Sequence, residues 1–413
     1  MIQVSSSEFG KKSLEQHTFQ AIVLDGNQRS ALATVRSLGR RGIAVAVAES
    51  RTGSLAAASR FCRSELVYPD PATAPDDFID WLGKTAVEQP EAVLLPMTDM
   101  TVPLVLRAAA TRPSLRTALP SEAAYHTVSD KGRLAQIAND VGVRTPATVR
   151  VSRSTLTSLD TSAFRYPIVV KPPLSATRIG AITTKRGVRY ASNPSELLAC
   201  IARMLADDTD ELLIQEYVEG HGAGVFALYE RGEPRLFFAH RRIREKPPSG
   251  GVSVVCESVA LPEQGVTIAR KLLDSVGWHG VAMVELKIDT QGQAWLIEIN
   301  ARFWGSLQLA VDSGADFPWL IYQIARGESP EIPPNYSVGK RLRWWLGDLD
   351  NLYARLRDSQ WTPTLFHKAR AMGEFLVPWS PGMRYEFLRW NDPAPSLAAL
   401  RQYVGALGRR RPG

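Results

Sequence analysis

The chain has 413 residues, 45% hydrophobic and 22% charged, which is the composition of a globular protein with room for two or three domains. It shows no apolar run of the roughly 20 residues that a membrane-spanning helix requires, no secretory signal, and only three widely spaced cysteines, which fit neither a disulfide framework nor a zinc site. The net charge of +7 comes mostly from residues 331–413, where 13 Lys and Arg face 7 Asp and Glu; in the absence of a nucleic-acid-binding motif, it favours small anionic substrates over nucleic acid.

The first third of the chain predicts a parallel sheet. Residues 1–18 are expected to form a disordered lead-in, and the cysteine content favours a cytoplasmic protein. An apolar run at residues 21–24, a helical pattern through 31–38 and a second apolar run at 43–48 then predict a βαβ unit, to which a strand at 93–95 adds. The first turn lacks the glycine-rich dinucleotide fingerprint, so a dinucleotide oxidoreductase is disfavoured.

Two loops of this sheet are expected at its ligand-facing edge, because the carboxyl ends of parallel strands open there. Gly26 and Asn27 follow the first strand, and we interpret them either as substrate contacts or as a tight turn with a helix cap. Thr98 and Asp99 follow the strand at 93–95, which makes them second-rank substrate candidates.

Around residue 120 the pattern changes to a helix that Ser129 is predicted to cap and Gly142 to end. Lys131 lies in the first turn of this helix, where a cation is mildly unfavourable, so a purely structural role explains it poorly. A strand at 166–171 ends in Lys171, which is either solvated or functional. The loop at 172–180 is read either as a phosphate-covering loop or as an ordinary surface connection.

A strand at 212–220 runs into a glycine-containing loop, and the backbone of an extended segment such as 216–218 can pair with the edge of a purine. Two further strands lead to Arg241, Arg242 and Arg244, beside a turn rich in proline and glycine. These arginines are interpreted either as a phosphate-facing cluster or as the solvated charges of an edge strand.

The most informative stretch is 280–306, where period-two alternation predicts a hairpin in which Glu285 faces Glu298, with Asn300 further along the same face. Two carboxylates about 4 Å apart repel by on the order of 4 kcal/mol at an effective dielectric constant near 20, so a cation is expected between them. An all-oxygen set suits Mg²⁺, and Arg302 is placed to meet a phosphate or carboxylate. An exposed hairpin with solvated acids is the less favoured alternative.

This ordered set of motifs resembles the ATP-grasp superfamily of ATP-dependent ligases over roughly residues 20–330. Its most specific part is Glu285 followed by Glu298, Asn300 and Arg302. The segment 240–251 and the run Asn-Ala-Arg-Phe-Trp-Gly-Ser are most similar to a branch of predicted carboxylate-amine ligases that includes D-aspartate ligases.

The resemblance implies roles for individual residues. Those expected to bind the ATP phosphates are Lys131, Lys171, Arg241, Arg242 and one or more of Ser175, Thr177 and Arg178. Those expected around the adenosine are Gln215, Glu216 and Val218 for the adenine and Glu219 for the ribose. Those expected to hold two Mg²⁺ ions, with Mn²⁺ as a substitute, are Glu285, Glu298 and Asn300. The expected catalytic set is Arg302, Lys171 and Arg242.

The resemblance also implies an α/β fold of the α+β ATP-grasp type in several parts. These are a Rossmann-like domain at 19–125, an ATP-grasp domain at 126–330 with a small lid at about 145–215 and a main antiparallel sheet, and a helical C-terminal extension at 331–413. Apolar residues at helical spacing between 342 and 356 predict a helix that packs on the body as a cap, in preference to a basic helix on a membrane surface.

The implied reaction activates a carboxylate as an acyl phosphate with Mg-ATP and joins it to an amine, releasing ADP and phosphate. A phosphotransferase of the same fold and a non-catalytic nucleotide-binding regulator are the alternatives. The expected partners are small carboxylate and amine substrates, with a homodimer possible. No general base is identified, because His240 and His279 are better explained as structural histidines.

Overall fold

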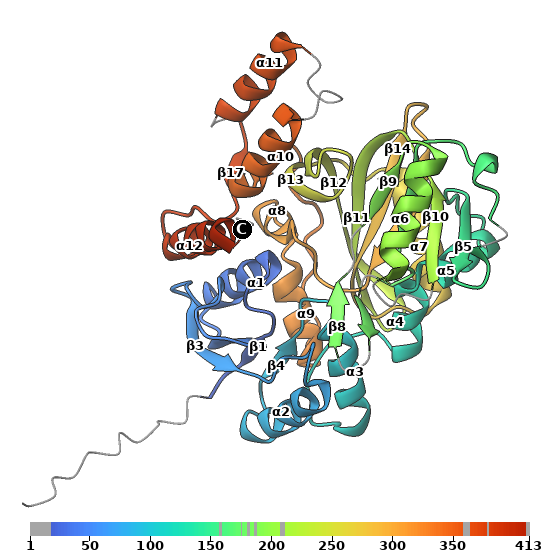
Figure 1. The fold of residues 1–413 in the computed structure, drawn as a ribbon. Coiled ribbons are helices and arrows are strands. Elements are labelled where there is room, and N and C mark those ends of the chain that lie inside the picture. The colour runs from blue at the N-terminus through green and yellow to red at the C-terminus, as the bar shows by residue number, and fades with distance from the viewer. Residues whose placement is uncertain are drawn as a thin grey trace, which may run out of the picture.

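The computed structural model describes residues 18–156, 159–174, 176–179, 182–185, 188–206, 211–357, 364–377 and 380–409. Side chains are not described for residues 176–179, 182–185, 206 and 409. Except for Thr18, the predicted lead-in lies outside these residues. Figure 1 shows a parallel sheet at the N-terminus, a large antiparallel sheet, a small sheet covered by a helix, and helices from the C-terminal third that lie beside the first two sheets.

The N-terminal sheet is parallel with the strand order β3-β2-β1-β4, as the βαβ pattern predicts. Its elements are β1 (Ala21–Val23), α1 (Arg29–Gly39), β2 (Val45–Glu49), β3 (Cys62–Val67), α2 (Pro75–Glu88), β4 (Val93–Leu95) and α3 (Val102–Thr111). The predicted strand at 93–95 is therefore confirmed. The apolar strands β1, β2 and β4 are buried on both faces between helices, which explains their continuous apolar runs.

The loop after β1 is structural rather than substrate-binding. A side chain at Gly26 would lie 2.5 Å from Ser54 Oγ, so only glycine fits there. The Asn27 side chain donates to Glu49 at 3.0 Å and accepts from the Leu55 backbone at 3.2 Å, and neither Gly26 nor Asn27 lines the main cavity. Of the two interpretations of this loop, the structure favours the tight turn.

Two helices, α4 (Glu122–Ser129) and α5 (Lys131–Asp140), connect the sheets. The predicted cap was wrong by one residue: Ser129 ends α4, and Asp130 caps α5 by accepting hydrogen bonds from the backbone of Gly132 and Arg133. Its carboxylate also compensates the cation that follows it in the first turn. The positive φ of 66° at Gly142 agrees with the predicted helix end.

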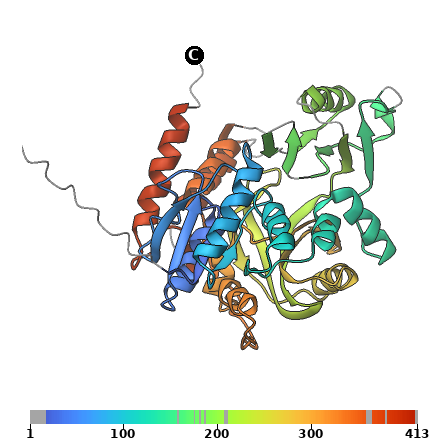
Figure 2. The ribbon, with the colours of Figure 1, turned by 90° about the horizontal axis from the view of Figure 1, so that it is seen from below.

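The small sheet has the order β5-β10-β6-β9, and α6 packs against its strands. Its elements are β5 (Thr148–Ser152), a 3-10 turn at Thr161–Ala163, β6 (Ile168–Lys171), β9 (Arg189–Ala191), α6 (Pro194–Ala206) and β10 (Glu211–Glu216). A separate hairpin is formed by β7 (Ala176–Ile179) and β8 (Ile182–Lys185). This sheet lies to one side of the large sheet (Figure 2).

The large sheet is mostly antiparallel, with the order β15-β14-β11-β12-β13-β16-β17. Its first five strands are β11 (Gly220–Glu230), β12 (Glu233–Lys246), β13 (Val252–Ser258), β14 (Gly280–Asp289) and β15 (Ala294–Asn300), with α7 (Glu263–Ser275) between β13 and β14. Alternate residues of β11 serve two cores: Phe226 and Leu228 pack towards the N-terminal sheet, and Val225 and Ala227 pack with α4, α5 and α7. One core therefore joins the two sheets.

After β15 come α8 (Leu307–Asp312) and α9 (Phe317–Ala325), followed by the C-terminal extension. The extension consists of β16 (Arg341–Arg343), α10 (Trp345–Arg357), α11 (Leu365–Leu376), β17 (Met383–Tyr385) and α12 (Ala394–Arg409). It packs on the body as predicted, with α10 against β12 and β13. The prediction of a wholly helical extension was incomplete, because β16 and β17 extend the large sheet. Among the helices that the structure describes, none is long and apolar enough to cross a membrane.

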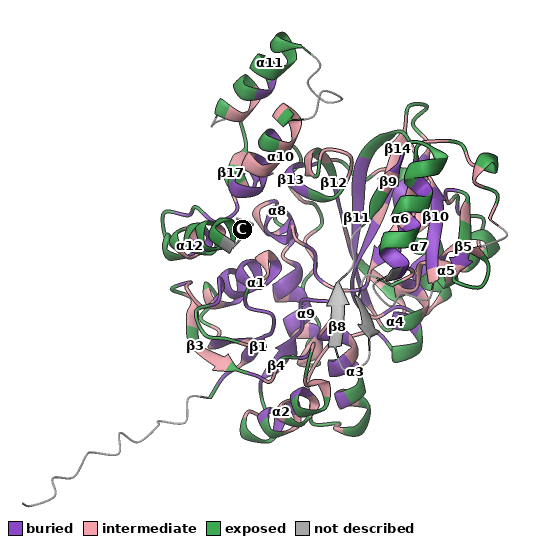
Figure 3. Cartoon of the chain, viewed as in Figure 1, coloured by how far each residue is buried: buried purple, intermediate pink, exposed green. Residues whose placement is uncertain are grey.

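A buried ion pair fastens the extension to the N-terminal domain. Arg36 on α1 is fully buried and donates to Asp392 at 2.7 Å and to the backbone oxygens of Glu386 and Phe387. Asp392 also accepts from the Ser59 hydroxyl at 2.8 Å. Figure 3 shows α1 largely buried, whereas much of α11 is exposed. The extension is therefore an integral part of the fold.

Replacing Asp392 with alanine should lower the free energy of unfolding by about 3–5 kcal/mol, because it leaves the Arg36 guanidinium buried without a counter-charge. Urea denaturation followed by circular dichroism measures this loss. Asp80→Ala, which removes an exposed partner of Arg112, is the control and should have little effect. An equal effect of the two substitutions would contradict this role of Asp392.

Candidate active site

A cavity of about 690 Å³ lies where the three sheets meet. The small sheet contributes Lys171 and Gln215, the large sheet contributes Glu285 and Glu298, and the loops of the N-terminal domain contribute residues such as Thr98. Most of the residues singled out from the sequence therefore line this one cavity, although they come from distant parts of the chain.

The hairpin places the two carboxylates opposite each other, as predicted, with Glu285 paired to Glu298. β14 ends at Asp289 and β15 begins at Ala294. A regular hairpin would pair these two residues, but beside the turn Ala294 lies opposite Ile288, a shift of one residue. A bulge next to Glu285 restores the pairing at the site. Such bulges are common beside active sites, where they redirect side chains.

Each carboxylate has a different cationic partner. Arg242 Nη2 lies 2.6 Å from Glu285, and Lys131 Nζ lies 3.4 Å from Glu298. Burial raises the pKa of Glu285, and Arg242 offsets that effect only in part. Burial also acts to raise the pKa of Glu298, but the nearby Lys131 and Lys171 outweigh it and lower that pKa overall. The cavity thus holds one firmly ionised acid beside one whose ionisation an added cation would favour.

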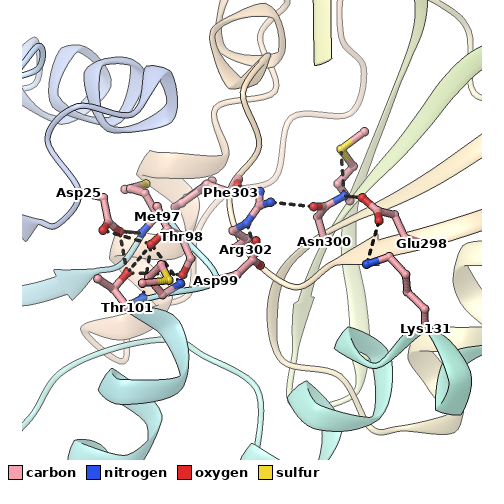
Figure 4. A network of polar contacts seen from close by, with 12 residues as sticks. Asp25, Met97, Thr98, Asp99, Thr101, Lys131, Glu298, Asn300, Arg302 and Phe303 are labelled. Carbon is pink, nitrogen blue, oxygen red and sulfur yellow. Dashed lines mark hydrogen bonds and ion pairs between the residues drawn. The ribbon is translucent and has the colours of Figure 1, made fainter. Parts of the chain in front are cut away.

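Arg302 connects this hairpin to the N-terminal domain (Figure 4). Its Nη2 donates to Asn300 Oδ1 at 2.8 Å, and the Asn300 amide in turn donates to Glu298 at 3.2 Å. On its other side Arg302 Nε lies 2.9 Å from Asp99. Arg302, which is predicted to meet the substrate, is thus held in one orientation from two sides.

The Asp99 loop is held in place by Asp25, which is buried beneath it. Asp25 accepts hydrogen bonds from the backbone of Met97 at 2.9 Å and from the hydroxyls of Thr98 at 3.1 Å and Thr101 at 2.6 Å. Thr98 lines the cavity, whereas Asp99 acts through Arg302. Sequence reasoning found Thr98 and Asp99 but missed Asp25, whose φ of 57° is not visible in the sequence.

Lys171 ends β6 inside the cavity and is only 3% exposed. Its Nζ donates to Gln215 Oε1 at 2.7 Å, and Gln215 donates onward to the Thr148 hydroxyl at 2.9 Å. Burial lowers the pKa of Lys171 to about 8, although Glu298 counteracts the effect. A bound anion would favour the charged form of this buried lysine.

The end of β10 and the residues that follow it form one wall of the cavity. Gln215, Glu216 and Val218 line it as predicted, together with Tyr217 and Tyr190, which sequence reasoning missed. The two tyrosine rings lie 6.0 Å apart between centroids, edge to face. Glu219 is exposed and does not line this cavity, so its predicted ribose contact finds no support here.

The predicted arginine cluster is divided between separate places. Arg242 lines the cavity, but Arg241 faces away from it and bonds to Glu257 at 2.6 Å. Arg244 forms a two-point pair with Asp348. Strand alternation places Arg241 and Arg242 on opposite faces of β12, whereas the pairing of β12 with β13 is irregular on both sides of Arg244. A shared phosphate-binding role for the three arginines is therefore not what this geometry shows.

Three predicted phosphate contacts cannot be placed. Ser175 lies outside the described residues, and the side chains of Thr177 and Arg178 do too, although their backbone forms part of β7. The backbone of Lys131 donates to the carbonyl of Pro173 at 3.1 Å, so the start of this loop contacts the first residue of α5.

The two candidate histidines differ. His279 Nδ1 accepts from the backbone of Arg231 at 3.1 Å, in agreement with a structural role. His240 lines the cavity, contacts the Ser306 hydroxyl at 3.3 Å, and has no partner for Nε2 among the described residues. Burial keeps the pKa of His240 well below its usual range, so the ring is neutral.

The donor set fits a hard divalent cation. The described residues contain no group of three or more His, Cys, Asp or Glu that could hold a metal, because this set consists of two carboxylates, Glu285 and Glu298, with the Asn300 amide. Mg²⁺ commonly takes only one or two carboxylates and completes its shell with water and phosphate oxygens. The residues present therefore suit Mg²⁺ bound together with a nucleotide.

Comparisons with known proteins agree with this geometry. Residues 208–345, about a third of the chain, match a family model described as ATP-grasp in the biosynthetic pathway with Ter operon. A D-alanine–D-alanine ligase of Hydrogenovibrio crunogenus is 26% identical over 178 residues, which are 41% of this chain and 54% of that protein. The chain thus matches about half the length of this curated relative.

Solved structures show the same fold. An L-amino acid ligase of Bacillus licheniformis superposes with a TM-score of 0.57 at 19% identity, covering 75% of both chains. The N5-carboxyaminoimidazole synthetase of Staphylococcus aureus, complexed with ADP, gives 0.59 at 14% identity and covers 79% of this chain and 82% of that one. The predicted ATP-grasp fold class and resemblance are confirmed.

The lowered pKa of Lys171 makes nucleotide affinity depend on pH. Bound phosphates would keep Lys171 charged, whereas the free site loses that charge as the pH rises through about 8. The affinity for a non-hydrolysable ATP analogue with Mg²⁺ should therefore fall above pH 8, by up to about tenfold per pH unit, when measured by calorimetry between pH 7 and 9.

Lys171→Arg is the matched control, because arginine stays charged throughout this pH range. The affinity of this variant for the ATP analogue should not fall in the same way. Identical pH dependence in the two proteins would show that Lys171 does not contact the phosphates.

Proposed function

From its ATP-grasp fold and the match of residues 208–345 to an ATP-grasp family model, we propose that this protein is an ATP-dependent ligase that activates a carboxylate as an acyl phosphate and joins it to an amine. The observation that carries this proposal is the pairing of Glu285 with Glu298 in a cavity that also holds Lys171 and Arg302. Such a site can neutralise a triphosphate on one side and a carboxylate on the other.

In this proposal the nucleotide lies between the small and the large sheet. The backbone of residues 216–218 meets the adenine edge, and Tyr190 and Tyr217 provide apolar surface beside it. Lys171 and Lys131 meet the phosphates, since both lie close enough to Glu298 to lower its pKa. Their charges neutralise the triphosphate and leave the γ-phosphoryl group directed towards Arg302.

Glu285, Glu298 and Asn300 would hold Mg²⁺, which when bound supplies charge neutralisation across the phosphate oxygens. Arg302 then orients the substrate carboxylate: Asp99 and Asn300 fix its guanidinium from two sides, which leaves little freedom to lose on binding. Arg242 lies 2.6 Å from Glu285 and favours its ionised form, although burial still raises the pKa of that acid overall.

A carboxylate does not react with an amine directly, because its leaving group would be oxide. Transfer of the γ-phosphoryl group replaces that leaving group with phosphate; the amine then forms the new C–N bond as the C–O bond to phosphate breaks, and its proton is lost. Water competes for the same acyl phosphate, so a reaction site inside the cavity, with the segment at 246–251 in its lining, serves to limit the access of water.

The products distinguish this reaction from its alternatives. With Mg-ATP and a matrix of carboxylic acids and amines, the protein should release ADP and phosphate only when one carboxylate and one amine are both present. Chromatography of the nucleotides together with a phosphate assay measures this. Transfer that needs no amine would indicate a phosphotransferase, and AMP as the product would contradict the acyl-phosphate route.

A further inference from the structure

One end of the cavity is built by three separate parts of the chain. Arg29 comes from the first turn of α1, Lys246 from the end of β12, and Trp344 from the segment between β16 and α10. None of these residues was singled out from the sequence, and the ATP-binding roles described above use none of them. The question is what this end of the cavity binds.

Trp344 is flanked by two cations. The Arg29 guanidinium carbon lies 4.3 Å from the ring centroid, and Lys246 Nζ lies 5.5 Å from it. The aromatic face attracts each cation, but two like charges around one ring also repel each other. The arrangement therefore depends on carboxylates that compensate for this repulsion.

Two acids of the C-terminal extension provide that compensation. Glu386 accepts from Arg29 Nη1 at 2.9 Å, and Asp350 pairs with Lys246. Asp350 is itself held by the Tyr403 hydroxyl of α12, at 2.6 Å. Neither acid lines the cavity, whereas both cations do; the side chains are 2% exposed for Glu386 and 20% for Asp350, against 14% for Arg29 and 33% for Lys246. Each cation is thus more exposed than the acid that pairs with it.

Arg29 also touches the segment that orients the substrate. A side chain at Gly305 would lie 2.3 Å from Arg29 Nη2, so glycine is needed for this approach. Gly305 follows Arg302 by three residues. Helix stability does not explain Arg29, because a cation in the first turn opposes the helix dipole and the Gln28 side chain makes no capping bond there.

We propose that Arg29 and Lys246 bind a carboxylate that is not itself activated, so that one substrate carries an acid group besides the reacting centre. This inference rests on the proposed function. The carboxylate that receives phosphate must lie at Arg302, whereas Arg29 and Lys246 line the cavity beside Trp344 and can hold a second one. The substrate class that fits is an α-amino acid whose amine attacks while its own carboxylate stays bound.

The non-reacting carboxylate could also belong to the acyl substrate, if that substrate is a dicarboxylic acid. Phosphate release is therefore measured for substrate pairs in which one carboxylate at a time is replaced by a carboxamide, such as L-alaninamide for L-alanine or succinamate for succinate. A loss with the amidated amine supports the pair and assigns it to the amine substrate. A loss with the amidated acid supports it and assigns it to the acyl substrate, and no loss with either overturns it.

Lys246→Met tests the residue directly. It should raise the KM for the carboxylate-bearing substrate by about tenfold or more, with a smaller change in kcat and an unchanged affinity for the ATP analogue. Lys246→Arg should restore the KM. Lys84→Met, the same substitution at an exposed position of α2, is the control and should match the unmodified protein. An unchanged KM in Lys246→Met would overturn the proposal while leaving the ligase function intact.

If no pair of substrates gives turnover, the proposed function fails, and calorimetry with L-glutamate at saturating ATP analogue decides the fate of the Arg29–Lys246 pair. Binding that weakens in Lys246→Met but not in Lys84→Met upholds it. Equal binding to both variants, or no binding to the unmodified protein, overturns it.

Discussion

The rest of the structure depends on one electrostatic constraint, the opposition of two partly buried carboxylates on a hairpin. Glu285 and Glu298 face each other in adjacent strands, where their repulsion must be balanced. Arg242 comes from β12, Lys131 from α5 and Lys171 from the small sheet, so each cation belongs to a different element. Balancing the two charges therefore requires most of the fold to be assembled around them.

The same constraint reaches the two ends of the chain. Arg302 contacts both Asn300 of the hairpin and Asp99 of the N-terminal domain. The buried Asp25 in turn holds the loop in which Asp99 lies. The C-terminal extension participates through buried acids that pair with arginines of α1, as Asp392 does with Arg36. We infer that the N-terminal domain and the extension form one support for the substrate end of the cavity.

The parts of the site that the sequence predicted are those encoded locally. The register of Glu285 and Glu298 follows from period-two alternation and a short turn, although a bulge was needed to restore it. Lys171 was identifiable because it ends an apolar strand. The separation of Arg241 from Arg242 was missed, although strand alternation alone places neighbouring residues on opposite faces of the sheet.

Contacts between distant segments could not be predicted. The pair formed by Arg29 and Lys246 exists only because α1, β12 and the extension meet at Trp344, and these segments are more than 90 residues apart in the chain. Side-chain identities carry little information about such meetings, because an arginine in a first helical turn is ordinarily solvated. The cap at Asp130 shows the same limit on a smaller scale, since Ser129 satisfied the local pattern equally well.

Electron paramagnetic resonance of Mn²⁺ tests the central claim most directly, because it reports the bound cation without any need for turnover. The account predicts that an ATP analogue strengthens Mn²⁺ binding to the unmodified protein, and that the double substitution of Glu285→Gln and Glu298→Gln abolishes this binding while the fold is retained. Undiminished nucleotide-dependent Mn²⁺ binding by the doubly substituted protein would contradict the account.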